Sequence, residues 1–142
     1  MNLVVVGNDN LHLLKEFIAS LGEAGKTFRY FDTRDLTVLK NHLATLLFVG
    51  EDGKALAYGH LDKAGEKVWL GIAVLPFAQG KSLGIRMMDV LLQEAERRNI
   101  TIVYASADEK NEPIKNVLRK FGFTLEEIKL GICYYVFNRV ES

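Results

Sequence analysis

The sequence predicts an α/β fold of the α+β type, in which helices flank a mixed sheet that is mostly antiparallel with one parallel pair of strands at its centre. Two observations predict it. Short apolar runs bounded by turn residues recur along the chain, and Asp52-Gly53, a strong hairpin signal, separates two of them. A long amphipathic stretch at 84–98 joins the runs that end at Val74 and Ala105, and a helical crossover of this kind makes the two strands parallel.

The N-terminal part predicts a strand followed by two helical stretches. The run at 3–6 is apolar and β-branched and closes at Gly7-Asn8-Asp9, as a strand does. Apolar residues then recur at helical spacing over 13–21, so a helix should end at Gly22. A further helical stretch is expected at 36–43. A strand, turn and helix can also open a dinucleotide-binding domain, but the Gly-x-Gly-x-x-Gly fingerprint of that domain is missing.

Three predicted strands form an antiparallel meander before the long helix. They lie at 46–49, 55–61 and 68–74, with turns at Asp52-Gly53 and at Asp62-Lys63-Ala64-Gly65. The third strand is apolar on both faces, which is typical of a central strand.

The C-terminal third brings the expected totals to about seven strands and about four helices. The remaining strands are predicted at 102–105, 125–128 and 130–137. A polar loop at 106–112 precedes a short helix, which Pro113 should open as its first residue and Gly122 should end. No repeat, linker or low-complexity segment divides the sequence, so we expect residues 1–142 to form a single domain.

The segment between the third meander strand and the long helix has the composition of an anion-binding turn. After Pro76, the loop Gln79-Gly80-Lys81-Ser82-Leu83-Gly84 leads directly into the helix. Small residues let backbone N–H groups approach an anion, a helix begins with unpaired N–H groups and a partial positive charge, and Lys81 adds a cation. The spacing matches neither a dinucleotide fingerprint nor a P-loop. The loop can also serve only as a helix entry, and both interpretations stay open at this point.

Two segments together resemble the signatures of the GNAT superfamily of acetyl-CoA-dependent N-acyltransferases. Val74-x-Pro76 followed by 79–84 is similar to its acyl-CoA-binding pattern, Gln/Arg-x-x-Gly-x-Gly/Ala. Asn111, followed by a short helix that ends in Phe121-Gly122-Phe123, is similar to its second signature. The resemblance covers roughly 67–123 and implies a GNAT-like sheet whose central parallel strands splay apart.

The resemblance also implies where acetyl-CoA binds, in the wedge between the two parallel strands. The backbone of Ile72, Ala73 and Val74 would hold the pantetheine arm and the thioester, and a backbone N–H near Ala73 or Val74 would stabilise the oxyanion. Asn111 would contact the arm near its sulfur end. The pyrophosphate would lie on the residues of the loop, which are Gln79, Gly80, Lys81, Ser82, Leu83 and Gly84.

Two residues depart from the family pattern. Ser82 stands where the family usually has its first glycine, although a serine can also cap the start of a helix. Leu118 stands four residues before Gly122, where many members carry the tyrosine that protonates the leaving thiolate. A thiol with a pKa of about 8.5 leaves tolerably well without that proton. Tyr58, Tyr104 and Tyr134 are possible substitutes.

The middle strand of the meander carries candidate catalytic residues. Tyr58, His60 and Asp62 alternate and so project to one face of the sheet. A histidine, with an ordinary pKa of about 6.5, can accept the proton of an attacking amine directly or through water. Asp62 would lie near the turn and orient the imidazole. The alternative for His60 is a structural role as a partly buried, hydrogen-bonded side chain.

The segment between the first two helices carries the candidate acceptor-binding residues. Arg29, Tyr30 and Arg34 place an aromatic ring beside two cations. Guanidinium groups bind phosphate with two hydrogen bonds and aromatic rings stack on flat faces, so the three could hold an amino sugar or a sugar nucleotide. In the family this segment usually forms part of the acceptor site. A core tyrosine beside two solvated arginines is the alternative.

The bulk properties argue against several other classes of protein. Eighteen basic residues balance eighteen acidic ones, so no overall field draws the chain to nucleic acid or to an anionic membrane. Apolar runs are too short to cross a bilayer. Cys133, the single cysteine, should be a buried thiol in a strand, which fits the reducing cytoplasm. We expect no metal cofactor.

The sequence thus predicts an N-acetyltransferase that uses acetyl-CoA to acetylate a primary amine of a small molecule. A protein or peptide N-acetyltransferase is the first alternative, although the sequence lacks the acidic cluster that such a groove prefers. A non-catalytic acyl-CoA-binding module, suggested by Ser82 and Leu118, is the second. The oligomeric state stays open, with a homodimer through the C-terminal strand as one form.

Overall fold

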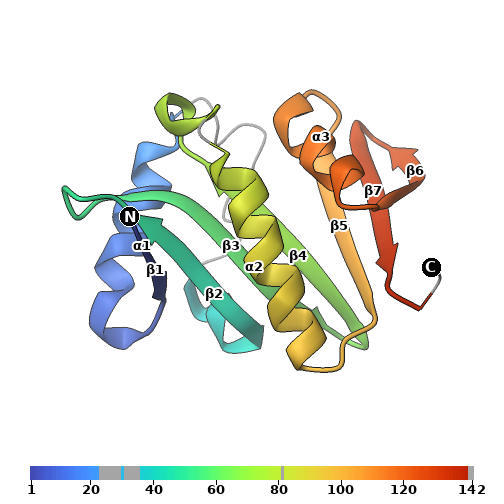
Figure 1. Ribbon diagram of the computed structural model, residues 1–142, viewed down its shortest axis with the longest axis horizontal. Helices are drawn as coiled ribbons and strands as arrows, with labels where there is room; N and C mark the ends of the chain where they lie inside the picture. The colour runs from blue at the N-terminus through green and yellow to red at the C-terminus, as the bar shows by residue number, and fades with distance from the viewer. Residues whose placement is uncertain (23–29, 31–35, 81, 141–142) are drawn as a thin grey trace.

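The computed structural model describes residues 1–22, 30, 36–80 and 82–140. Within these residues, seven strands form one mixed sheet in the order β1-β2-β3-β4-β5-β7-β6 (Figure 1). Neighbouring strands are antiparallel except β4 and β5, which are parallel. The strands are β1 (Asn2–Val5), β2 (His42–Val49), β3 (Ala55–Ala64), β4 (Lys67–Val74), β5 (Ile102–Asp108), β6 (Thr124–Lys129) and β7 (Ile132–Asn138).

The four predicted helices correspond to three α-helices and one 3-10 helix. They are α1 (Leu11–Ser20), the 3-10 helix η3 (Leu36–Asn41), α2 (Leu83–Arg97) and α3 (Glu112–Lys120). The helix expected at 36–43 is shorter than predicted, because His42 and Leu43 begin β2 and the run 42–49 pairs with β3. Across the described part of the chain, no helix is both long and apolar enough to cross a bilayer.

Helices α1 and α2 cover opposite faces of the sheet. Phe17 of α1 stacks on Tyr58 of β3, with 6.1 Å between ring centroids. The next residue, Gly59, faces α2 so closely that a Cβ there would lie 2.5 Å from Cγ of Met87. Because successive strand residues point to opposite faces, the two helices sandwich β3. Helix α3 lies on the α2 side, beside β5 (Figure 1).

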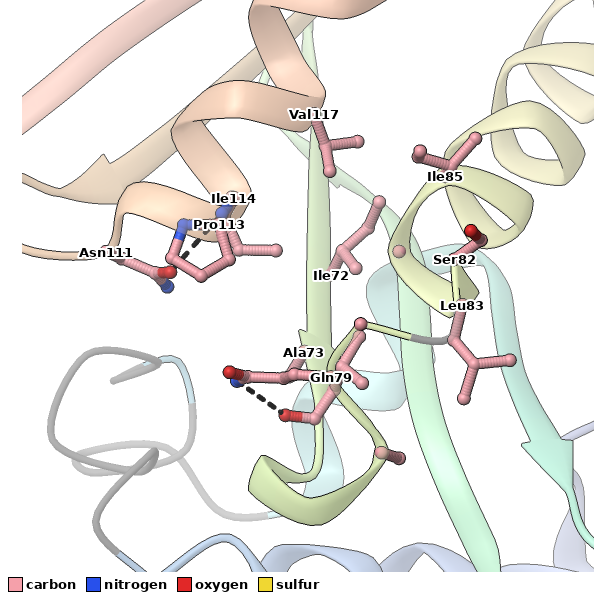
Figure 2. A pocket seen from close by; sticks show the side chains of 14 residues that line it. Ile72, Ala73, Gln79, Ser82, Leu83, Ile85, Asn111, Pro113, Ile114 and Val117 are labelled. Atoms are coloured by element: carbon pink, nitrogen blue, oxygen red, sulfur yellow. Dashed lines mark hydrogen bonds between the residues drawn. The ribbon is translucent and has the colours of Figure 1, made fainter.

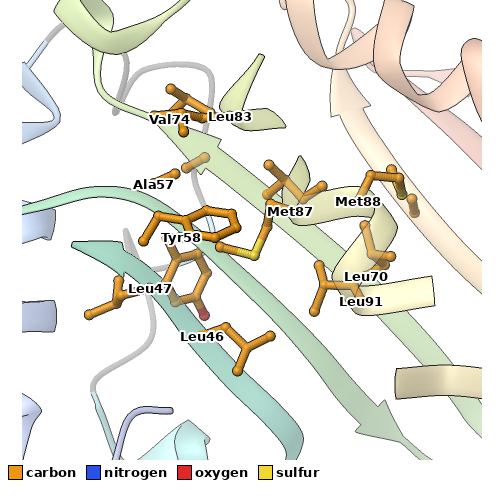
Figure 3. Close-up of a cluster of buried hydrophobic side chains, with 14 of the residues drawn as sticks. Leu46, Leu47, Ala57, Tyr58, Leu70, Val74, Leu83, Met87, Met88 and Leu91 are labelled. Atoms are coloured by element: carbon orange, nitrogen blue, oxygen red, sulfur yellow. The ribbon is translucent and has the colours of Figure 1, made fainter. Parts of the chain in front are cut away.

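The main core lies between α2 and the sheet. Met87, Met88 and Leu91 are fully buried and pack on buried side chains of the strands, such as Leu46 and Leu70 (Figure 3). Burying one side chain of this size contributes about 1.5 to 3 kcal/mol to folding. The buried, unpaired thiol of Cys133 belongs to the same core, as expected for a strand residue.

Strands β4 and β5 part from each other soon after they begin. They are paired only at Trp69 with Tyr104 and at Leu70 with Ala105. Strand β4 continues to Val74 and β5 to Asp108, and Figure 1 shows the two diverging. The predicted splayed parallel pair is therefore present at the centre of the sheet.

One turn lies later in the chain than the sequence suggests. Strand β3 runs to Ala64, since Lys63 pairs with Val68 and Ala64 with Lys67. The reversal then falls at Gly65, whose φ of +63° suits glycine. The turn expected at 62–65 is therefore placed too early, and Asp62 lies inside the strand.

The C-terminal third also differs at its boundaries. Residues 106–108, expected in a loop, extend β5 because they pair with β7. Pro113 is the second rather than the first residue of α3, since Asn111 caps the helix and Glu112 opens it. Leu130, expected in the last strand, lies in the turn between β6 and β7 with a φ of +52°.

Candidate active site

A cavity of about 230 Å³ lies where β4 and β5 diverge, between β4, the start of α2 and the start of α3 (Figure 2). All the predicted acyl-CoA residues that the structure describes line it, which are Ile72, Ala73, Val74, Gln79, Gly80, Ser82, Leu83, Gly84 and Asn111. Apolar side chains of Ile85, Ile114 and Val117 complete the walls. Lys81 lies outside the described residues.

One wall of the cavity is the edge of β4. Beyond Leu70 the backbone of this strand is no longer paired with β5, and Ile72, Ala73 and Val74 line the cavity. An unpaired strand edge offers N–H and C=O groups to an extended ligand. The geometry suits a pantetheine arm, which carries two amide groups along a flexible chain.

The other end of the cavity is the amino terminus of α2. The first N–H groups of this helix have no acceptor within the helix, and they carry the positive end of its dipole. Gly80 reaches the helix through a left-handed turn with a φ of +88°. The side-chain amide of Gln79 donates to the carbonyl oxygen of Val74 over 3.4 Å and ties the loop to the end of β4. These N–H groups can bind a pyrophosphate.

Ser82 does not cap α2 with its side chain, contrary to the role suggested from the sequence. It occupies the N-cap position in a left-handed conformation, with a φ of +63°, and its hydroxyl makes no capping hydrogen bond. The backbone here takes the path that glycine would follow, so the serine keeps the loop geometry at a conformational cost of about 1 kcal/mol.

Asn111 stands across the cavity from Gln79 (Figure 2). Its Oδ1 accepts a hydrogen bond from the N–H of Ile114 over 3.3 Å and so caps α3. A cap of this kind uses the amide oxygen. The NH₂ group remains the donor that a ligand in the cavity could use.

Leu118 lines a second, smaller cavity of about 40 Å³ that also touches Gly71, Ile72, Ala105 and Ile114. Its side chain is 1% exposed and belongs to the core. The position from which many relatives supply an acidic hydroxyl is therefore apolar in this chain. Tyr104 and Tyr134, the other tyrosines considered for that role, both contact the ring of Trp69. Trp69 pairs with Asp62 and so lies on the His60 face of the sheet, which is the face opposite Leu118.

His60 lies on the α1 face of the sheet, next to the point where the wedge opens. Its Nδ1 is 2.6 Å from Oη of Tyr58, and both side chains are almost fully buried. A Cβ on Gly71 would lie 2.5 Å from Nε2 of His60, so the imidazole rests directly on the backbone of β4. Burial and, to a lesser extent, Tyr30 and Asp62 raise the pKa of Tyr58 well above its usual value of 10.0. The phenol therefore stays protonated at neutral pH.

Asp62 belongs to a second polar chain beside His60. Oη of Tyr30 donates to Oδ2 of Asp62 over 2.8 Å and lies 2.7 Å from Nε2 of His42. Nδ1 of His42 is 2.8 Å from Oγ1 of Thr45. Burial lowers the pKa of His42, although Asp62 opposes the shift, so the imidazole is neutral near pH 7. The hydrogen bonds then run from Thr45 through His42 and Tyr30 to the carboxylate.

The rings of Tyr30, His42 and His60 pack on one another. The Tyr30 and His60 ring centroids are 4.4 Å apart, and those of His42 and His60 are 4.7 Å apart. Tyr30, one of the predicted acceptor residues, thus lies against the candidate base. Arg29 and Arg34, the other two, lie outside the described residues.

Sequence reasoning missed Gly71, His42 and Thr45. An isolated glycine in an apolar strand signals a close approach of another group, so Gly71 could have been found. His42 and Thr45 share a face only because the pairing of β2 with β3 shifts between His42 and Ala44. The sequence gives no sign of such a bulge. Among the described residues, no group of three or more His, Cys, Asp or Glu side chains could hold a metal ion.

Comparison with protein families gives one match. The model described as the acetyltransferase (GNAT) family matches residues 11–123. A comparison with curated protein sequences finds no significant match.

Many solved structures share the fold at low sequence identity. A GNAT-family acetyltransferase from Staphylococcus aureus superimposes with a TM-score of 0.78 and 18% identity, covering 97% of this chain and 98% of the other. A phosphinothricin acetyltransferase from Sinorhizobium meliloti in complex with acetyl-CoA gives 0.71 and 15%, covering 96% and 87%. The ribosomal-protein-S18-alanine N-acetyltransferase from Escherichia coli gives 0.70 and 14%, covering 96% and 92%. The last two proteins are named for a small-molecule acceptor and for a protein acceptor, respectively.

Proposed function

Because the chain belongs to the acetyltransferase (GNAT) family, we propose that it transfers the acetyl group of acetyl-CoA to a primary amine of a small molecule. The observation that carries this proposal is the cavity between β4 and α3, which begins where the parallel strands part and ends at the amino terminus of α2. An extended thioester with a pyrophosphate at its far end matches both features.

Acetyl-CoA lies in this cavity with its pantetheine arm along β4. The free backbone groups of Ile72, Ala73 and Val74 pair with the arm, and the loop from Gln79 to Gly84 receives the pyrophosphate. Asn111 donates its NH₂ group near the sulfur end. The complex of the Sinorhizobium meliloti relative with acetyl-CoA supports the choice of cosubstrate.

The reaction is a direct attack of the neutral amine on the thioester. A C–N bond forms at the carbonyl carbon, the C–S bond breaks, and CoA leaves as a thiolate. The proton of the attacking nitrogen passes to Nε2 of His60, directly or through water. A backbone N–H near Ala73 or Val74 stabilises the tetrahedral oxyanion, and one such donor is worth about 2.7 to 4 kcal/mol. Since a thiolate is a tolerable leaving group, the reaction proceeds with Leu118 in place of an acid.

Tyr58 positions His60 for this step. For Nε2 to accept a proton, Nδ1 must carry one and donate it to Oη of Tyr58, which lies 2.6 Å away. The buried phenol thereby fixes both the ring orientation and the tautomer. Asp62 acts on His60 through Tyr30, to which it is hydrogen-bonded, rather than by direct orientation.

The acceptor enters from the α1 face, where Tyr30 lies against His60. Arg29, Tyr30 and Arg34 favour an amino sugar or a sugar nucleotide. The buried thiol of Cys133 supports a reducing compartment, the cytoplasm, as the place where the reaction occurs.

A non-catalytic acyl-CoA-binding module is the second candidate. The buried, apolar Leu118 favours it, because the usual acid is absent. In that case acetyl-CoA would bind but would not be consumed.

Release of free CoA thiol from acetyl-CoA over a panel of primary amines tests the proposal. We expect turnover with at least one small amine, and His60→Gln should lower kcat at least tenfold while leaving acetyl-CoA binding unchanged. Tyr58→Phe should lower kcat less and shift the pH profile, since it removes only the tautomer control. Tight acetyl-CoA binding without thiol release for every amine would instead establish the binding module.

A further inference from the structure

Three aromatic side chains gather on the sheet face that carries His60. Trp69 of β4 lies 5.4 Å from Tyr104 of β5 between ring centroids, at an interplanar angle of 38°. Tyr134 of β7 stands edge-on to Trp69, with 6.4 Å between centroids and an angle of 76°. We call these three side chains the aromatic platform. Each is partly exposed and can therefore be reached by a ligand.

The aromatic platform adjoins the candidate reaction centre. Trp69 and Gly71 are two residues apart on β4 and therefore face the same side, about 7 Å apart along the strand. Trp69 and Tyr104 also form one of the two residue pairs that join β4 and β5 before they part. Helix α1 lies over the β3 side of the sheet, away from β5 and β7 (Figure 1). The platform is thus continuous with the site where the amine must arrive.

Charged groups of both signs border the platform. The Lys67 Nζ lies 4.7 Å from the centroid of the Tyr104 ring and already occupies the face of this ring, so a ligand must use Trp69 and Tyr134. Asp62 is the register partner of Trp69, and its carboxylate lies on the same face. Aromatic faces and a carboxylate both attract a protonated amine before it loses its proton for attack.

We propose that the aromatic platform is the floor of the acceptor site, and that the acceptor is an arylalkylamine, a primary amine joined by a short chain to a flat apolar ring. The ring rests on Trp69 and Tyr134, and the amine reaches His60, whose imidazole covers Gly71. This inference rests on the proposed acetyl transfer and names its substrate class.

The platform favours an apolar ring over a sugar. A sugar ring carries several hydroxyl groups, and any that contacts the apolar aromatic surface loses water without gaining a hydrogen-bond partner. Stacking of one aromatic ring on another gains about 0.5 to 1.5 kcal/mol beyond its buried area. An amino sugar, which Arg29 and Arg34 favour, is the competing acceptor and serves as the comparison ligand.

The chain offers a built-in probe, because Trp69 is its single tryptophan. The protein is saturated with CoA, so that no turnover occurs, and the emission of Trp69 is titrated with phenethylamine and, in parallel, with glucosamine. We expect a saturable change with phenethylamine at a dissociation constant at least tenfold below that of glucosamine.

Variants of Tyr134 separate stacking from other effects. Tyr134→Leu should weaken phenethylamine binding about five- to tenfold, and Tyr134→Phe, which keeps the ring, should retain wild-type affinity. Both variants should keep the affinity for CoA, measured by thermal shift, because Tyr134 lies on the face opposite the CoA cavity.

The outcomes test the acceptor assignment and the proposed acetyl transfer separately. No saturable change with phenethylamine, equal affinity for glucosamine, or equal loss in Tyr134→Leu and Tyr134→Phe would overturn the platform as an acceptor floor. The proposed acetyl transfer fails on a different observation, the absence of thiol release from acetyl-CoA with every amine. Binding of phenethylamine without its acetylation, while another amine is acetylated, would therefore overturn the acceptor assignment and keep the proposed acetyl transfer.

Discussion

Ser82 holds a backbone conformation that favours glycine, at the entrance to α2. Replacing it with glycine removes the clash of its Cβ at a φ of +63°. Glycine also loses more chain entropy than serine on folding, and this loss offsets part of the gain. The net effect of Ser82→Gly should be a stabilisation of about 0.5 to 1 kcal/mol, which raises the unfolding midpoint by roughly 2 to 4 °C. Ser82→Ala is the matched control, since it keeps Cβ. An equal rise in both variants would show that the backbone is not strained there.

Gly71 leaves room for the imidazole of His60 on β4. In Gly71→Ala the new Cβ would fall 2.5 Å from Nε2 of His60, so the ring must move. We expect a destabilisation of about 1 to 3 kcal/mol, as for other overpacked sites, and a loss of acetyl transfer. Denaturant unfolding measures the first effect.

The same substitution in a His60→Ala background provides the control for Gly71. With the imidazole gone, the added methyl group has space and should cost little stability. A penalty that is undiminished in the double variant would place the clash elsewhere in the sheet.

His42 gives the fold a predictable response to acid. Burial lowers its pKa below the 6.5 of the unfolded chain, so the unfolded state binds the proton more readily. The stability that neutral His42 contributes is therefore complete above pH 6.5 and is lost as the pH falls toward its folded-state pKa. Unfolding midpoints measured between pH 7.5 and 5.5 should drop more steeply in the wild type than in His42→Asn. Parallel curves would refute the assignment.

At the scale of elements, α3 begins at a residue with two separable roles. Asn111 caps the helix through Oδ1 and lines the cavity proposed for CoA, where its NH₂ group is the remaining donor. Asn111→Ala should cost about 1 kcal/mol of stability and weaken acetyl-CoA binding. Asn111→Asp keeps an acceptor for the cap, so it should retain stability and still bind acetyl-CoA more weakly. Calorimetric unfolding and titration with acetyl-CoA separate the two effects. Unchanged affinity in Asn111→Asp would confine Asn111 to capping.

Most elements could be predicted from local patterns, because their signals are local. The hairpin at Asp52-Gly53, the amphipathic α2 and the crossover that makes β4 parallel to β5 all depend on residues close in sequence. The errors lie at strand ends, where pairing with another strand determines how far an element extends. Pairing with β4 carries β3 past Asp62, and pairing with β7 extends β5 to Asp108.

The candidate site also combines residues that are contiguous in sequence, which could be predicted, with residues that only the fold brings together. The loop from Gln79 to Gly84 is contiguous in sequence, and its described residues line the cavity as the family signature implies. The polar chain from Thr45 through His42 and Tyr30 to Asp62 joins three separate segments across a bulge, so no sequence spacing indicates it. Gly71 carried a signal, an isolated glycine in a central strand, but its partner His60 is visible only in the sheet register.

At the scale of the whole molecule, the sheet would separate the two substrates of the proposed reaction. The cavity proposed for acetyl-CoA lies on the side of α2 and α3, whereas His60, Tyr30 and the aromatic platform lie on the side of α1. The two sides meet only where β4 and β5 part, beyond Leu70. In the proposed reaction the thioester must lie in that opening for an amine on the other face to reach it, so the splay of the central strands is the feature on which the proposed function depends.

Thermal unfolding with and without saturating acetyl-CoA tests this account most directly, with NAD as the control ligand. A ligand at about a hundred times its dissociation constant adds about 2.7 kcal/mol, which should raise the midpoint by on the order of 5 to 10 °C. Ile114→Trp, which fills the cavity, should abolish the rise, while Asn116→Trp on the exposed side of α3 should keep it. The absence of any shift with acetyl-CoA in the wild type, or an equal shift with NAD, would contradict the assignment of the cavity to acetyl-CoA.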